Sequence, residues 1–179
     1  GTAARLLKAT SSFGVTFDSF ADFVTFGIGP AALIYYRLLS TDVFEGWFRT
    51  VVLVATAGYA VSLAIRLAKF NVTTKDEPVF HGVPGTLMAA VLCAGYLAWD
   101  KYHLSETVLF VLPAVLIVGA ALMLSNLRLP KLKMRKNKAL NVFQIFNVVV
   151  AYIIGPLRLL PEYLFGLAVV YLTVGLAVG

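Results

Sequence analysis

The sequence is poor in charge and nearly lacks cysteine, and each scarcity excludes a class of protein. Only 13% of its 179 residues are charged and 60% are hydrophobic, whereas soluble domains have about 25% charged and roughly 45–50% apolar residues. This composition excludes an ordinary soluble domain, and the mean hydropathy of +0.86 indicates an integral membrane protein. The single Cys93 excludes a disulfide within the chain and a cysteine metal site, so we expect it to pack in the core.

The start of the sequence also lacks the features of a secretory signal. Residue 1 is glycine, and no charged region, short apolar segment and cleavage site precede the first apolar run. We therefore expect the sequence to begin inside a longer protein.

Long apolar runs are abundant instead. A helix needs roughly 17–25 apolar residues to cross a bilayer, and six windows come near or within this range: 18–39, 51–70, 84–99, 104–125, 139–157 and 160–178. No internal repeat and no long polar insert divide the chain. The sequence predicts an all-α fold, a polytopic transmembrane helical bundle of about six spans, in a single domain over residues 1–179.

The basic residues predict the orientation, because cytoplasmic loops are rich in Lys and Arg. Eleven of the fifteen basic residues lie in the N-terminal segment, at or after the end of the second window, or after the fourth. Arg37, Arg49, Lys101 and Arg158 lie on the alternate side. We expect the first set of segments to be cytoplasmic, and the run RLPKLKMRKNK at 128–138 to contact lipid headgroups rather than nucleic acid.

Two acids, Asp18 and Asp22, lie at the expected cytoplasmic end of the first window. A spacing of four places both side chains on one face of a helix. One interpretation is that Asp18 caps the helix and Asp22 complements its dipole. The other is that the pair binds a hard cation such as Mg²⁺ or Mn²⁺, which prefers oxygen ligands.

The residues around the acids form a spaced motif, G-x2-A-R-x8-G-x3-D-x3-D, made by Gly1, Ala4, Arg5, Gly14, Asp18 and Asp22. Alone, Gly14 would suggest a turn between helices and Arg5 a membrane anchor. Together the six positions resemble the second part of the CDP-alcohol phosphotransferase signature, D-x2-D-G-x2-A-R-x8-G-x3-D-x3-D. The first two Asp residues of that signature are expected just upstream of residue 1.

Three longer stretches narrow the resemblance within that family. They are ARLLKATSSFGVTFDSFADFVTFGIGPA at 4–31, RLAKFNV at 66–72 and HGVPGTLMA at 81–89, and they are similar to membrane-embedded phosphatidylserine synthases. The resemblance implies six core spans followed by two additional ones. This chain would then supply the last four core spans, and residues 139–178 the two additional C-terminal spans.

The resemblance implies a reaction and roles for the motif residues. The hydroxyl of L-serine would displace CMP at the β-phosphorus of CDP-diacylglycerol, giving phosphatidylserine. Asp18 and Asp22 resemble ligands of Mg²⁺ or Mn²⁺, and Asp22 also the general base. Gly14 would let the nucleotide approach the backbone, Arg5 would support either the carboxylates or a phosphate, and Gly1 would permit close packing beside the missing acids. With Ala4 and Asp18, these residues form the expected cofactor-binding set. With two of four carboxylates, residues 1–179 alone are expected to be inactive.

The acceptor needs its own ligands. Arg66, Lys69 and Asn71 lie at the expected cytoplasmic end of the second window, where they are candidates for binding the serine carboxylate or the lipid phosphate. The alternative is that they are interfacial anchors whose charged ends reach water. His81 and His103 have no ligand spacing with the acids and are expected to take no part.

Other functions remain open at this stage. The acceptor could instead be glycerol 3-phosphate or inositol, and a membrane transporter is the main alternative outside the enzymes, although it would usually place acids nearer the midplane. A structural membrane subunit would not need the motif. The resemblance further implies a bacterial cytoplasmic membrane, an active site facing the cytoplasm, contact with membrane lipids, a homodimer as a candidate assembly and no nucleic-acid partner.

Overall fold

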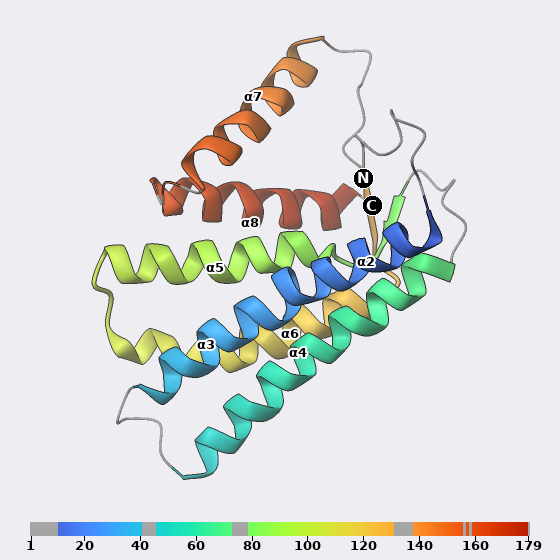
Figure 1. Cartoon of the computed structure of the whole chain (residues 1–179). Helices are drawn as coiled ribbons and strands as arrows, with labels where there is room; N and C mark the ends of the chain where they lie inside the picture. The colour runs from blue at the N-terminus through green and yellow to red at the C-terminus, as the bar shows by residue number, and fades with distance from the viewer. Residues whose placement is uncertain are drawn as a thin grey trace. The chain divides into compact units, whose positions relative to one another are not determined.

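A computed structural model describes residues 11–40, 46–72, 79–130, 138–155, 157 and 159–178 (Figure 1). The motif residues Gly1, Ala4 and Arg5 lie outside the described residues. The chain forms two compact units. The first contains Gly1–Thr74 and Leu109–Leu124, and the second contains Lys75–Val108 and Ser125–Gly179.

The first unit begins with one continuous helical run from Ser12 to Leu39, which is long and apolar enough to cross a membrane. It consists of α2 (Ser12–Asp22), the π-helical segment η1 (Phe23–Ile28) and α3 (Gly29–Leu39). Ser11 caps its start, because its hydroxyl oxygen accepts a hydrogen bond from the Gly14 N–H at 3.0 Å. The helix therefore begins well before residue 18, where the apolar window starts.

The π-helical segment has a cause in the sequence. Pro30 has no N–H, so the carbonyl of Phe26 loses the donor that an α-helix would give it, and the proline ring crowds that same carbonyl. One wider turn relieves this crowding. The hydroxyl of Tyr59 donates to the Phe26 carbonyl at 3.0 Å, and so supplies the missing partner from a neighbouring helix.

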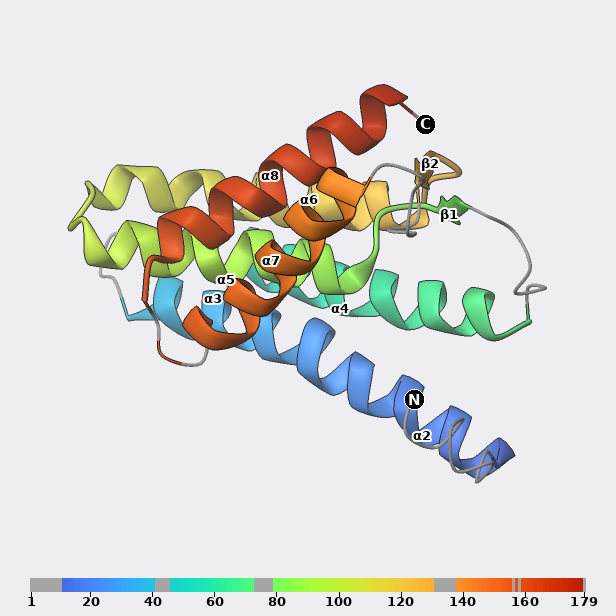
Figure 2. The ribbon, with the colours of Figure 1, turned by 90° about the horizontal axis from the view of Figure 1, so that it is seen from above.

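Helix α4 (Trp47–Val72) forms the centre of the first unit and packs against η1, α3 and α6 (Leu112–Leu124). Its buried residues recur every three or four positions and so form one face: Val52, Ala55, Thr56, Tyr59, Ser62 and Leu63. Gly27 of η1 allows a close approach to this face, because a Cβ there would lie 3.1 Å from Leu63 Cδ2. Figure 2 shows α3 beside α4 and α2 spreading away from it.

The second unit contains α5 (Gly85–Lys101), α7 (Lys138–Ile154) and α8 (Pro161–Val178). Helices α5 and α8 pack closely where the Phe165 ring lies against Gly95, so that a Cβ on this glycine would be 3.0 Å from the ring. At one end of the pair, Lys101 Nζ and Glu162 Oε1 form an ion pair at 2.7 Å.

Two short strands join loops of the second unit. Strand β1 (Val79–His81) pairs antiparallel with β2 (Arg128–Pro130), with Phe80 opposite Leu129. The first strand precedes α5 and the second follows α6 in the sequence, so the ladder brings the two loops together. This agrees with the charge pattern, which assigns both loops to one side.

The structure confirms the all-α fold. Each of the six apolar windows contains a helix among the described residues, with the fourth composed of the 3₁₀ segment η2 (Glu106–Val111) and α6. Three runs qualify as membrane spans by length and composition: Ser12–Leu39, Trp47–Val72 and Glu106–Leu124. Pro161–Leu176 is apolar but shorter. The expected count of about six spans is not confirmed.

Candidate functional site

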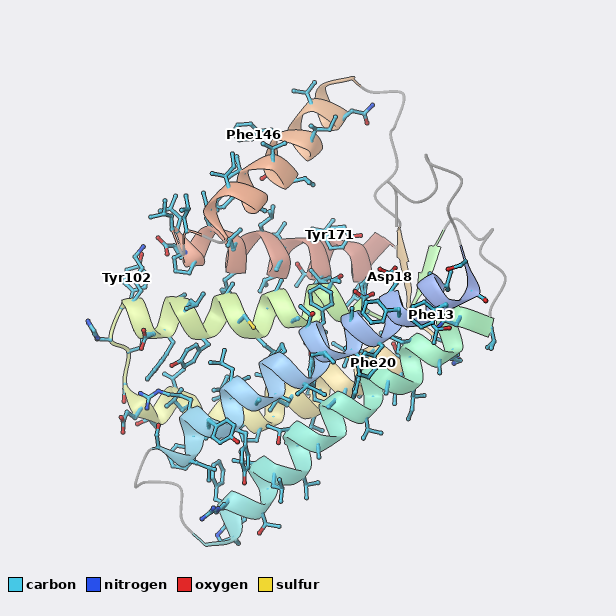
Figure 3. All side chains as sticks on the ribbon, viewed as in Figure 1. Phe13, Asp18, Phe20, Tyr102, Phe146 and Tyr171 are labelled. Carbon is cyan, nitrogen blue, oxygen red and sulfur yellow. The ribbon has the colours of Figure 1, made fainter. Side chains whose placement is uncertain are left out.

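The predicted acids lie on one face of α2. Gly14, Asp18 and Asp22 follow one another at intervals of four, so they share that face. The opposite face carries Phe13 and Phe20, which are 76% and 61% exposed. Figure 3 shows Asp18 and Phe20 on opposite sides of the helix. Helix α2 thus carries carboxylates on one side and aromatic rings on the other.

The position of the acids corrects the capping interpretation. Ser11 is the N-cap, Asp18 lies well inside α2, and Asp22 is its last residue. Asp18 therefore does not cap the helix, and neither acid lies in the first turn, where the helix dipole acts most strongly. Gly14 likewise lies within the first turn of α2 rather than between helices. Capping cannot explain why two acids occur in this apolar sequence.

The acid pair has the donor chemistry for a hard cation but is only part of a shell. Two like charges one turn apart repel each other, and no Lys or Arg among the described residues forms an ion pair with either. Carboxylate oxygens are the ligands that Mg²⁺ and Mn²⁺ prefer. The described part of the chain contains no group of three or more His, Cys, Asp or Glu side chains suited to a metal. The pair fits a cation that receives further oxygens from elsewhere.

Gly14 lies on the same face of α2 as these acids. A Cβ built there would meet one atom within 4 Å, the Ser11 hydroxyl oxygen at 3.2 Å. At Gly27, by contrast, the Leu63 and Phe23 side chains leave little room for a Cβ. A side chain at Gly27 would crowd packed apolar groups, whereas one at Gly14 would crowd the hydroxyl of the capping Ser11.

The C-terminal end of α4 reaches the acid helix through Asn71. The Asn71 amide nitrogen donates to the Ser19 hydroxyl oxygen at 2.9 Å, although the two residues are 52 apart in sequence. Ser19 lies between Asp18 and Asp22 in the sequence DSFAD. The structure thus brings one of the three predicted acceptor ligands next to the acids.

Arg66 continues the buried face of α4 by one further turn beyond Ser62 and Leu63. Its side chain is half-buried, and its Nε is buried without a hydrogen-bond partner among the described residues. A buried donor without a partner is costly, so this atom has unused binding capacity. Lys69, one turn further on, is exposed.

The histidines lie in the second unit. His103 adopts a left-handed backbone conformation, with φ of 47°, two residues after the end of α5, and the side chain of His81 lies outside the described residues. Among described residues, no metal-ligand group includes a histidine.

Three residues of this region were not identified from the sequence: Ser11, Ser19 and Tyr59. Ser11 had a usable signal, because a serine directly before an amphipathic run is a common N-cap. Ser19 and Tyr59 act through contacts with residues far away in the sequence, so no local pattern indicated them.

Comparison with known proteins identifies a family and several relatives that are similar to this chain. The model of the CDP-alcohol phosphatidyltransferase family matches residues 1–123. CDP-diacylglycerol–serine O-phosphatidyltransferase of Helicobacter pylori is 35% identical over 138 residues, covering 74% of this chain and 55% of that protein. The enzyme of the same name from Bacillus subtilis is 34% identical over 137 residues, covering 74% and 67%. Archaetidylserine synthase of Methanothermobacter thermautotrophicus is 28% identical over 108 residues, covering 60% and 43%.

The chain spans about half the length of the first of these relatives and two thirds of the second. The family match covers more than half of the chain and includes α2, α4 and the acid face between Gly14 and Asp22. The chain belongs to the CDP-alcohol phosphatidyltransferase family.

Proposed function

We propose that the protein containing this chain transfers a phosphatidyl group from CDP-diacylglycerol to L-serine, releasing CMP. The observation that carries the proposal is that all three relatives have serine in their names. Two are CDP-diacylglycerol–serine O-phosphatidyltransferases, and the third is an archaetidylserine synthase, so the lipid part of the name differs. A serine acceptor is the feature common to these names. We propose the same acceptor for the protein that contains this chain. We also propose CDP-diacylglycerol as its donor, because the names of the bacterial enzymes include it.

In the proposed reaction, the serine hydroxyl oxygen forms a bond to the β-phosphorus of CDP-diacylglycerol. The bond from that phosphorus to the bridging oxygen breaks, and CMP leaves with the electron pair. A hydroxyl is too weak an acid to attack efficiently without help, so a base is needed in the site. We assign this role to Asp22, whose position in the motif resembles that of the family's candidate general base; no basic side chain among the described residues forms an ion pair with it.

Asp18 and Asp22 would together hold Mg²⁺ or Mn²⁺. When bound, such a cation neutralises the charge of the diphosphate and of the departing CMP. Gly14, on the same face as the acids, has no side chain and would let the nucleotide come close to the backbone. Asp18 then acts mainly in donor binding and Asp22 in both binding and proton transfer.

Arg66 is the strongest candidate for holding the carboxylate of serine. Its guanidinium group forms planar, charge-assisted hydrogen bonds that match a carboxylate or a phosphate, and its Nε has no partner among the described residues. Lys69 adds positive charge one turn away. We place this site at the cytoplasmic face of a bacterial inner membrane, as the basic loops favour.

The proposal is tested by giving purified full-length protein CDP-diacylglycerol with each candidate acceptor in turn and measuring CMP release. We expect release that depends on serine and on a divalent cation. CMP release with glycerol 3-phosphate or inositol but not with serine would support phosphatidyl transfer from CDP-diacylglycerol and reject serine as the acceptor. No release with any alcohol would reject the transferase function.

A further inference from the structure

Helix α2 has little to hold it in place. None of its residues is buried, and η1, which continues it directly, is the one element with which it shares substantial contact among the described residues. An amphipathic helix is normally fixed by packing one face against its neighbours. The acids are therefore carried on an element whose orientation depends on few interactions.

The contact between Ser19 and Asn71 is one of those interactions. Both polar atoms of the Asn71 amide point to the Ser19 hydroxyl, with the nitrogen at 2.9 Å and the oxygen at 3.4 Å. The hydroxyl also lies 3.2 Å from the carbonyl oxygen of Val15, to which it donates within α2. The Asn71 amide is thus engaged with the protein rather than left open for a small ligand.

Ser19 is well placed to transmit this restraint. Successive helix residues are about 100° apart, so Ser19 lies about 60° around the helix from Asp22 and about 100° from Asp18. A hydrogen bond at Ser19 therefore limits rotation of the acid face about the axis of α2. It also limits the separation of α2 from the C-terminal end of α4, which bears Arg66 and Lys69.

We infer that Asn71 is a positioning residue, which through Ser19 holds the carboxylates of Asp18 and Asp22 in register with the acceptor-binding end of α4. This inference rests on the proposed function for its catalytic consequence. It differs from the expectation that Asn71 binds substrate directly. Misplacing a reacting group by about 1 Å can lower the rate by about a hundredfold, so a single exposed hydrogen bond can affect turnover more than it affects stability.

The experiment compares Asn71→Ala, Ser19→Ala and the double variant in the full-length protein. We expect each single variant to lower kcat by about tenfold or more, with the KM for serine changed by less than twofold. The double variant should be no slower than the slower single variant, because both remove the same contact. Ser19→Thr keeps the hydroxyl and should recover most of the activity.

A matched control and an independent readout complete the test. Thr16→Ala removes a hydroxyl of α2 that bonds the Ser12 carbonyl within the helix, and should leave kcat unchanged. Hydrogen exchange of the α2 amides should accelerate in Asn71→Ala and Ser19→Ala but not in Thr16→Ala. This measurement needs no activity, so faster exchange together with no serine-dependent CMP release in the unmodified protein would reject the proposed function and keep the contact's role.

Three results would overturn the inference. A higher KM for serine in Asn71→Ala with normal Ser19→Ala would make Asn71 a substrate ligand. Additive losses in the double variant would mean that the two residues act separately. Unchanged kcat and unchanged exchange in both single variants, in an enzyme active with serine, would show that α2 is held by other interactions.

Discussion

At the scale of single residues, the two acids of α2 are notable for their surroundings. Asp18 is exposed and Asp22 half-buried, and the described residues offer no ion pair to either. An ionisable group within an apolar helical run is costly and usually functional. The structure therefore makes the acids available to a ligand, while their difference in exposure suggests that they are not equivalent.

Replacing each acid separately should reveal different roles. Asp22→Asn removes the base, so we expect kcat to fall by about 10²–10⁴-fold while CDP-diacylglycerol binding stays nearly intact. Asp18→Asn should instead weaken divalent-cation and donor binding together. Steady-state kinetics over a cation titration would measure both effects, with the exposed Asp100→Asn as a control. An equal loss of cation affinity in both variants would mean that Asp22 is simply a second ligand.

Arg66 and Lys69 form a natural pair for testing acceptor binding. Arg66 lies on the packed face of α4 with a buried Nε that lacks a partner among the described residues, whereas Lys69 is exposed. Arg66→Gln should raise the KM for serine by roughly tenfold or more, in line with the 1.5–3 kcal/mol typical of hydrogen bonds to charged groups. The KM for CDP-diacylglycerol should change much less, and Lys69→Gln should have a smaller effect.

The same kinetic measurements can contradict this assignment in two ways. A parallel rise of both KM values in Arg66→Gln would assign the guanidinium to the lipid phosphate. Unchanged values would make this end of α4 an interfacial anchor.

At the scale of elements, hydropathy located the helices, and the exact ends required side-chain chemistry. The window at 18–39 missed the first turns of its helix, because Ser12, Gly14 and Thr16 are not apolar although they lie on a helix capped by Ser11. The π-helical segment was not predicted, since it arises where Pro30 meets a hydroxyl from another helix. The motif located the acid face, but the partner of Ser19 lies 52 residues away and left no local signal.

The π-helical segment offers a prediction at this scale. Tyr59 is fully buried, and its hydroxyl satisfies the Phe26 carbonyl. Tyr59→Phe should destabilise the protein by about 1 kcal/mol, because an unpaired carbonyl in an apolar environment is unfavourable. Thermal unfolding in detergent would measure the change. Tyr36→Phe, at a residue that is 70% exposed, should have little effect.

A double-mutant cycle can test whether the loss of stability in Tyr59→Phe depends on Pro30. Pro30→Ala restores a backbone N–H that can reach the Phe26 carbonyl. In that background Tyr59→Phe should cost clearly less than in the unmodified protein. Equal costs in both backgrounds would mean that the contribution of the Tyr59 hydroxyl does not depend on Pro30.

At the scale of the whole molecule, charge and structure agree on which loops belong together. The β1–β2 ladder pairs two loops that the basic residues assign to one side. In the sequence, Ser105 and Asn126 bracket the apolar run Glu106–Leu124, which is long enough to cross a membrane. A span between them requires that they face opposite compartments.

Cysteine labelling tests this orientation. In a Cys93→Ala background, Asn126→Cys should react with an impermeant thiol reagent from the cytoplasmic side only, and Ser105→Cys from the other side only. Inverted and right-side-out vesicles would distinguish the two sides. The reverse pattern would contradict the orientation inferred from the basic loops, and reaction of both from one side would contradict the span itself.

The π-helical segment Phe23–Ile28 also links the number of residues in this helix to the direction in which the acids point. A helix converts each residue into about 100° of rotation, so the number of residues between Asp22 and Pro30 determines the direction in which the acids point. Deleting one residue there would hardly alter hydropathy, and the protein would still insert in the membrane. It would, however, swing Asp18 and Asp22 by more than a quarter turn and carry Ser19 away from Asn71. Membrane insertion thus depends on the hydropathy of this helix. Catalysis depends in addition on the number of residues between Asp22 and Pro30.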